Sequence, residues 1–292
     1  MNAPHEAQNR AHQATRSIGG ILIDAGRLLP LDAERILNLQ REKNMRFGDA
    51  ALSLDLLSPD DIEFALAQQF DYAYLPRLTT GGSPLSRELV AAWKPQDKVV
   101  ENLRALRSQL MLRWFENVDR HALAIVSPEA SAGRSWLTAN LAVVFSQLGE
   151  RTLLIDADLR KPRQHTLFGL ENGIGLSAVL AERNDYRCIQ RVPDLRSLSV
   201  LTAGATPPNP QELLGRASFG RLLDAAAESY DVILIDTPAA LDAADAQMIA
   251  ARAQGAIIVA RNNVCTTKDL RQLSTDLEQF GVQLVGSVFN KY

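Results

Sequence analysis

Residues 127–142 read SPEASAGRSWLTANLA and stand between a short apolar run, HALAIV, and a stretch with the apolar spacing of a helix. An apolar strand, a loop and a helix in this order form the frame of a phosphate-binding loop, where free N–H groups at the helix start attract an anion. Such a loop normally reads GxxxxGK[ST]. Gly133 and Ser135 match that pattern, whereas Arg134 stands at the lysine position. The frame predicts an anion site, and Arg134 raises the question of whether that site is active.

Two glycine positions of the loop are also changed. Pro128 stands at the first glycine, and Ser131 stands where a glycine is expected two residues before Gly133. A residue other than glycine at positive φ costs on the order of 1 kcal/mol or more. The guanidinium of Arg134 keeps the positive charge of lysine, but it is longer and planar. We therefore expect weak or altered nucleotide binding.

Short apolar runs alternate with helix-like stretches after this loop. The runs are LAIV, TLLI, LSVL, VILI, GAIIVA and VQLVGSVF. Continuous apolar runs separated by helices are typical of a parallel sheet that is covered on both faces. We predict that residues 99–292 form one α/β domain, a doubly wound and mostly parallel sheet with ligands at the carboxyl ends of its strands.

Carboxylates follow two of the apolar runs. Asp156 and Asp158 come after TLLI, and Asp236 ends DVILID. In a parallel sheet these side chains reach the same edge as the loop. Backbone N–H groups for phosphates, with the Ser135 hydroxyl and carboxylates around a metal, are how proteins hold a Mg²⁺-nucleotide. The alternative is that each aspartate only caps the helix that follows its strand.

The chain before residue 99 is organised differently. Residues 1–15 are polar, as in a tail, and residues 16–76 contain two copies of one pattern that pair Gly19 with Gly48 and Pro30 with Pro59. This repeat predicts a small helical domain. Residues 77–98 include a cluster of Pro, Gly, Ser and Thr, which is typical of a linker.

Composition narrows the possible partners and location. The formal net charge of -3 gives no electrostatic reason to expect nucleic acid. The two cysteines lack CxxC spacing, so neither a disulfide framework nor a zinc site is indicated. No apolar run approaches the roughly 20 residues that span a bilayer, and the first residues lack the apolar core of a signal peptide. We expect a cytoplasmic protein.

The ordered set of motifs resembles the bacterial tyrosine kinases, P-loop proteins related to the MinD and ParA ATPases. Within that family it is most similar to the EpsG-type kinase that accompanies chain-length determinants in exopolysaccharide clusters. The resemblance rests on ENLRALR, LLIDADLRKPRQH, LTAGATPPNPQELL, DVILIDTPA and VFNKY.

The resemblance implies a site for ATP and Mg²⁺. Asp156 would be the base that accepts the proton of the acceptor hydroxyl, and Asp158 would act beside it with Arg134. The metal would be held by Ser135, Asp158 and Asp236. The nucleotide would meet Gly133, Arg134, Ser135 and Trp136, with Asn290 at the adenine.

The resemblance also implies partners. The ExxRxxR segment, here Glu101, Arg104 and Arg107, serves oligomerisation in the family, and spacing of three places these residues on one helix face. A membrane-embedded chain-length determinant would hold the kinase peripherally at the inner membrane. Family kinases carry a tyrosine cluster beyond the last strand. This chain has Tyr292 in that region, and it is the phosphoacceptor candidate.

The module of residues 16–76 resembles the helical domain at the front of type II secretion and pilus assembly ATPases. Some of those domains bind cyclic di-GMP through paired RLG-type motifs. The counterparts here are SIG at 17–19 and RFG at 46–48, so the first copy lacks the arginine at the matching position, although Arg16 is adjacent.

Three hypotheses remain open at this stage. The leading one is an ATP-dependent protein-tyrosine autokinase that regulates exopolysaccharide synthesis, polymerisation and export. The second is a pseudokinase scaffold that senses a nucleotide. The third is a MinD/ParA-type positioning ATPase, against which the PPNPQELL and ExxRxxR segments argue.

Overall fold

The computed structural model describes residues 17–69, 83–117 and 119–291, and the chain divides into two compact units, 1–81 and 82–292. Each unit has its own hydrophobic core. None of the helices in these described stretches combines the length and apolar character needed to span a bilayer.

The first unit consists of two pairs of helices. The pairs are α2 (Ile18–Asp24) with α3 (Pro30–Lys43), and α4 (Phe47–Ser53) with α5 (Pro59–Gln69). The starts of corresponding helices lie 29 residues apart, which is the offset of the sequence repeat. α2 contacts α5 and α3 contacts α4, so each copy packs its helices against those of the other copy.

The second copy begins its long helix with a capping box. The Ser58 hydroxyl accepts from the backbone N–H of Asp61 at 3.2 Å, and the Asp61 carboxylate accepts from the backbone N–H of Ser58 at 3.0 Å. Arg27, from the first copy, pairs with the same carboxylate at 2.9 Å. Asp61 therefore both caps the start of α5 and forms an ion pair with the first copy.

The second unit contains a seven-stranded sheet in the order β3-β4-β2-β5-β1-β6-β7. All neighbours are parallel except β3 and β4, which are antiparallel. The strands are β1 (Ala122–Val126), β2 (Thr152–Asp156), β3 (Gln190–Arg191), β4 (Leu198–Leu201), β5 (Val232–Asp236), β6 (Gly255–Arg261) and β7 (Gln283–Asn290). The predicted α/β class and its mostly parallel sheet are confirmed.

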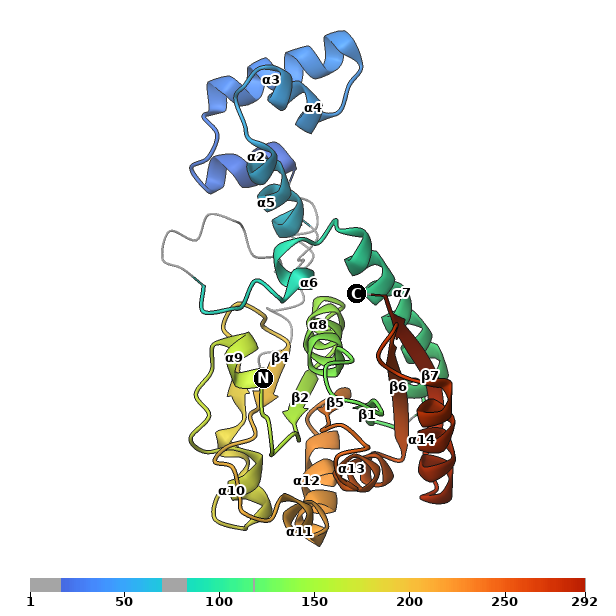
Figure 1. Ribbon diagram of the computed structural model, residues 1–292. Coiled ribbons are helices and arrows are strands. Elements are labelled where there is room, and N and C mark those ends of the chain that lie inside the picture. The colour runs from blue at the N-terminus through green and yellow to red at the C-terminus, as the bar shows by residue number, and fades with distance from the viewer. Residues whose placement is uncertain (1–16, 70–82, 118, 292) are drawn as a thin grey trace. The chain divides into compact units, whose positions relative to one another are not determined.

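Helices connect and cover these strands (Figure 1). They are α6 (Val90–Trp93), α7 (Lys98–Leu110), α8 (Arg134–Gln147), α9 (Gln164–Phe168), α10 (Leu176–Leu180), α11 (Pro210–Leu214), α12 (Ala217–Ala227), α13 (Asp245–Ala253) and α14 (Thr267–Gln279). A π-helical turn, Met111–Phe115, continues α7, and a 3₁₀ turn spans Tyr186–Cys188.

The strand order places the helices on opposite faces of the sheet. From β1 through α8 to β2 the chain moves one way along the sheet, and from β5 through α13 to β6 it moves the other way. Because parallel crossovers are right-handed, α8 and α13 cover different faces. The carboxyl ends of β1, β2 and β5 meet where these directions diverge, which is where open α/β sheets bind ligands.

Residues 83–98, the described part of the predicted linker of residues 77–98, belong to the second unit. This segment packs on the rest of that unit: the backbone N–H of Ala91 donates to the Asn140 side chain at 3.0 Å, and the Gln147 side chain donates to the Ala91 oxygen at 3.0 Å. Ala91, Ala92 and Trp93 are buried. A short apolar run, VAAW, anchors this segment on α8.

Candidate nucleotide site

The loop between β1 and α8 has the left-handed turns that its glycine positions predict. Ser131 has φ 60°, and Gly133, the N-cap of α8, has φ 97°. A Cβ on Gly133 would lie 2.6 Å from Nδ2 of Asn290, whose side chain donates to the Ala132 oxygen at 3.2 Å. Ser131 thus adopts the conformation that favours glycine, at a cost of roughly 1 kcal/mol or more.

Arg134 points its guanidinium back into the loop and is almost fully buried. Nε donates to the backbone oxygen of Thr237 at 2.9 Å, and Nη1 donates to the Glu129 oxygen at 2.9 Å and to the Ser127 hydroxyl. The side chain at the lysine position therefore holds the two ends of the loop to the end of β5.

A second arginine holds the loop from β6. Nη1 of Arg261 donates to the backbone oxygen of Ser131 at 2.8 Å. The strained residue of the loop is therefore tied to a strand that the sequence motif does not include.

Two buried carboxylates stand opposite each other at the strand ends. Asp156 and Asp236 are register partners in β2 and β5 and are both fully buried. Burial, and after it the charge of Asp236, raises the pKa of Asp156 well above its usual range. Burial raises the pKa of Asp236 to about 6, against the lowering effect of Gln164, Arg134 and the Ser135 side chain. Two such carboxyls favour sharing one proton at moderately acidic pH.

Asp156, the last residue of β2, and Asp158 also accept hydrogen bonds from the residues that follow. Oδ2 of Asp156 accepts from the backbone N–H groups of Arg163 at 3.0 Å and Gln164 at 2.9 Å. Oδ1 of Asp158 accepts from the N–H groups of Arg160 at 3.2 Å and Lys161 at 2.9 Å. Asp156 thus caps the start of α9 and Asp158 caps a turn, and Oδ1 of Asp156 accepts no hydrogen bond from the described residues.

The residues present fit a magnesium ion held mainly by its nucleotide and water. Oδ1 of Asp156 and Oδ1 of Asp236 are buried and accept no hydrogen bond within the described part of the chain. The Ser135 side chain lowers the pKa of Asp236, so hydroxyl and carboxylate are adjacent. In the described ranges no three His, Cys, Asp or Glu side chains form a metal cluster. Mg²⁺ commonly takes one or two carboxylates with waters and phosphates, which this arrangement can supply.

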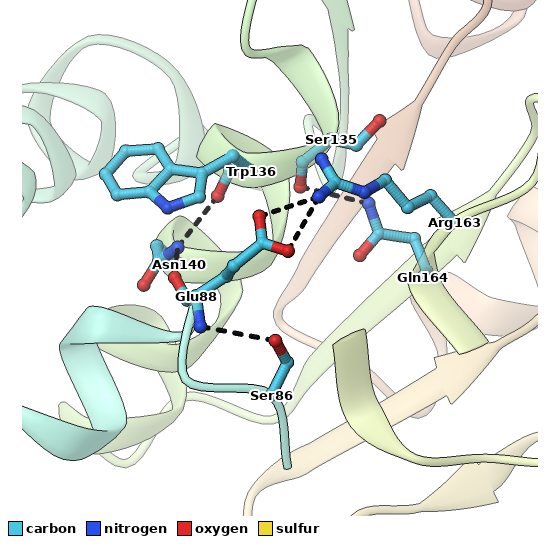
Figure 2. A network of polar contacts seen from close by, with 7 residues as sticks. All are labelled: Ser86, Glu88, Ser135, Trp136, Asn140, Arg163 and Gln164. Carbon is cyan, nitrogen blue, oxygen red and sulfur yellow. Dashed lines mark hydrogen bonds and ion pairs between the residues drawn. The ribbon is translucent and has the colours of Figure 1, made fainter. Parts of the chain in front are cut away.

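Gln164 is a site residue that sequence reasoning missed. It is fully buried at the start of α9, and its Nε2 donates to Oδ2 of Asp236 at 2.7 Å and to the Ser135 oxygen at 3.1 Å. Figure 2 shows its amide directed at Ser135. The signal was an uncharged residue in the basic run RKPRQH. Arg160, four residues before Gln164, forms an ion pair with the buried Asp245 at 2.8 Å.

Two further predicted residues are Trp136, expected at the nucleotide, and Tyr292, the phosphoacceptor candidate. Trp136 is half-buried, and its backbone oxygen accepts from the Asn140 side chain at 3.0 Å (Figure 2). Tyr292, the phosphoacceptor candidate, lies outside the described residues.

The ExxRxxR residues do not all face solvent. Glu101 is exposed and pairs with Arg104 within α7. Arg107 reaches α8, where its Nη1 donates to the Val144 oxygen at 2.8 Å. An oligomer contact by Glu101 and Arg104 stays a prediction, and Arg107 has a contact within the chain.

The fold and the loop define a P-loop-type nucleotide-binding protein. Residues 123–292 match the model of the CobQ/CobB/MinD/ParA nucleotide binding domain. The septum site-determining protein MinD of Pyrococcus horikoshii, solved with Mg-ADP, shares the fold with a TM-score of 0.53 at 24% identity, over 59% of this chain and 71% of that chain.

Kinases are more similar in sequence. The tyrosine-protein kinase YwqD of Bacillus subtilis is 36% identical over 211 residues, 72% of this chain and 88% of YwqD. The kinase domain of the Escherichia coli tyrosine kinase ETK superposes with a TM-score of 0.67 at 34% identity, over 69% of this chain and 79% of that chain. This chain belongs to the bacterial tyrosine kinase family.

Proposed function

We propose that this chain is an ATP-dependent protein-tyrosine kinase that regulates exopolysaccharide synthesis and export together with a membrane chain-length determinant. The observation that carries the proposal is the pair of buried carboxylates, Asp156 and Asp236, which lie beside Ser135. One oxygen of each carboxylate accepts no hydrogen bond from the described residues. Family membership supplies the reaction class.

The roles of the residues are those that the family resemblance implies, and their surroundings support them. Asp156 has a pKa raised well above its usual range, which suits a base that accepts the proton of the attacking tyrosine hydroxyl. Ser135, Asp236 and Asp158 would hold Mg²⁺ directly or through water, and bound magnesium would supply charge neutralisation at the phosphates. The N–H groups at the start of α8, after Gly133, would bind the phosphates.

The wider assembly is part of the same proposal. Glu101 and Arg104 would contact a neighbouring subunit in a homo-oligomer, Tyr292 would accept the phosphoryl group, and the partner would hold the chain at the inner membrane. Cyclic di-GMP at the first unit remains a candidate ligand. Its two predicted motifs begin at equivalent places, because Ser17 and Arg46 are the N-caps of α2 and α4.

One observation favours a second candidate, a scaffold that senses a nucleotide without turnover. Arg134 is occupied by the Thr237 and Glu129 backbone oxygens of its own chain, whereas a catalytic lysine reaches the phosphates.

Phosphotyrosine analysis separates these functions. The purified chain is incubated with Mg-ATP and the cytoplasmic segment of the chain-length determinant, as wild type and as Asp156→Ala. Signal in the wild type that is lost in the variant supports the kinase. Absence of signal in both supports the scaffold, and ATP hydrolysis without phosphotyrosine supports a positioning ATPase.

A further inference from the structure

Gln164 contacts each of the three segments that form the site. Its backbone N–H donates to Oδ2 of Asp156 at 2.9 Å, and its side-chain Nε2 donates to Oδ2 of Asp236 at 2.7 Å and to the backbone oxygen of Ser135 at 3.1 Å. One residue therefore links the ends of β2 and β5 to the loop.

The acceptors around Gln164 define which way its amide faces. Both neighbours of Nε2 are acceptor oxygens, so the opposite orientation would set oxygen against oxygen. The amide oxygen Oε1 therefore points away from them. It is buried, and no described residue donates to it.

Three acceptor atoms of this kind belong to residues that contact one another: Oε1 of Gln164, Oδ1 of Asp156 and Oδ1 of Asp236. A buried acceptor without a donor destabilises the folded chain, so such atoms usually have a partner. Oxygen acceptors from one amide and two carboxylates match the waters and ligands of a hydrated Mg²⁺. The three residues therefore meet at the candidate metal site, where a water of the magnesium shell can donate to the amide oxygen.

The position of Gln164 is fixed from outside the site. Nη2 of Arg163 donates to both carboxylate oxygens of Glu88, each at 2.7 Å. The backbone N–H of Ser86 donates to the Leu167 oxygen at 2.9 Å. Figure 2 shows Arg163 and Glu88 facing each other next to Gln164. Residues 86–88 thus hold both ends of α9.

We propose that Gln164 is a positioning residue of the Mg²⁺-nucleotide site. Its donor end orients Asp236 and the backbone of Ser135, and its acceptor end receives a hydrogen bond from a water in the magnesium shell. This inference rests on the proposed function, because it requires that the site bind Mg²⁺ with its nucleotide.

The first test replaces the amide while keeping its volume. Binding of a fluorescent ADP analogue to the full chain is titrated with Mg²⁺ and in EDTA, for the wild type and Gln164→Met. Outer-shell partners of metals typically contribute 10–100-fold to affinity. We expect the Mg²⁺ concentration at half-saturation to rise about tenfold, while the affinity in EDTA stays within about twofold. A purely structural role would weaken binding in both conditions.

Gln147→Met is the matched control. Gln147 is also a buried glutamine and donates to a backbone oxygen, that of Ala91 at 3.0 Å, at the far end of α8. We expect its Mg²⁺ dependence to equal that of the wild type.

A second variant covers the case in which Gln164→Met does not fold. Gln164→Glu keeps the shape of the side chain and places a third carboxylate next to Asp236. A cation bound nearby would reduce the repulsion between these carboxylates. We expect Mg²⁺ alone to raise the thermal unfolding midpoint of this variant more than that of the wild type. Equal Mg²⁺ dependence of the wild type and the folded Gln164 variants overturns the inference alone. A wild type that binds the analogue no better with Mg²⁺ than in EDTA overturns the proposed site and this inference together.

Discussion

Arg134 is hydrogen-bonded through Nε to the backbone oxygen of Thr237, 103 positions away, at 2.9 Å. Thr237 directly follows Asp236, so the residue at the lysine position of the loop is attached to the strand that carries a metal-ligand candidate. Nη1 of the same guanidinium binds the Glu129 oxygen at 2.9 Å. Nucleotide phosphates would have to compete with these internal acceptors for the arginine.

Arg134→Lys should therefore bind Mg-ATP more tightly than the wild type. An ammonium group is a compact point charge and cannot bridge Thr237 and Glu129 as a planar guanidinium does. We expect a gain in affinity of roughly tenfold, about 1.4 kcal/mol, and a lower thermal unfolding midpoint, because loop bonds are lost. Titration calorimetry and thermal unfolding measure the two effects.

Arg261→Lys is the control for this change. Arg261 also holds the loop, through the Ser131 oxygen at 2.8 Å, but it acts from β6 rather than from the lysine position. Its replacement should not tighten binding. If Arg134→Lys binds no better than the wild type, then the internal bonds of Arg134 do not limit nucleotide affinity.

The apolar runs were sufficient to predict the strands, because each buried parallel strand is continuous in sequence. β3 was not predicted, because it has only two residues, Gln190 and Arg191, and contains no apolar run. The carboxylates at the strand ends were predictable from position alone. The partners of Arg134 and the role of Gln164 were not, since they depend on contacts between segments far apart in the chain.

Stability should fall as the pH rises through the range in which Asp236 titrates. Its pKa is raised from 3.8 to about 6, so between these values the folded chain binds more protons than the unfolded chain. The free energy of unfolding therefore declines from pH 4 to pH 7, by at most on the order of 3 kcal/mol from this group. Denaturant unfolding in EDTA at several pH values measures it.

The comparison with Asp236→Asn tests this contribution together with the part of the Asp156 pKa shift that the charge of Asp236 causes. Carboxylates with a lowered pKa, such as Asp231 beside Arg151, give stability the opposite dependence at lower pH, and they are the same in both proteins. The variant should gain stability relative to the wild type as the pH rises from 4 to 7. Parallel pH curves for the two proteins would contradict the raised pKa of Asp236.

Arg107→Ala should mainly lower the stability of the chain, whereas Glu101→Ala should mainly weaken its self-association. Arg107 binds the Val144 oxygen on α8 at 2.8 Å, so its loss should lower the free energy of unfolding by about 1–2 kcal/mol. Glu101 is exposed, and its loss should change stability by less than about 0.5 kcal/mol while weakening self-association. Chemical denaturation and sedimentation velocity test the two. Equal stability losses would remove the distinction.

The ion pair between Glu88 and Arg163 should control local opening of α9 rather than global stability. Both side chains are 47% exposed, and exposed pairs contribute roughly 0–1 kcal/mol. Yet the Arg163 backbone N–H, with that of Gln164, binds Asp156. Glu88→Gln should therefore raise amide hydrogen exchange across 163–168 up to about fivefold and leave the unfolding midpoint nearly unchanged.

A matched pair elsewhere gives the control for that measurement. Glu182 and Arg221 form another exposed ion pair away from α9, so Glu182→Gln should not alter exchange across 163–168. Adding Arg163→Ala to Glu88→Gln should cause little further change, since the pair is already broken. If exchange in α9 is the same with and without the Glu88 carboxylate, then residues 86–88 do not fix the helix that presents Gln164 to the site.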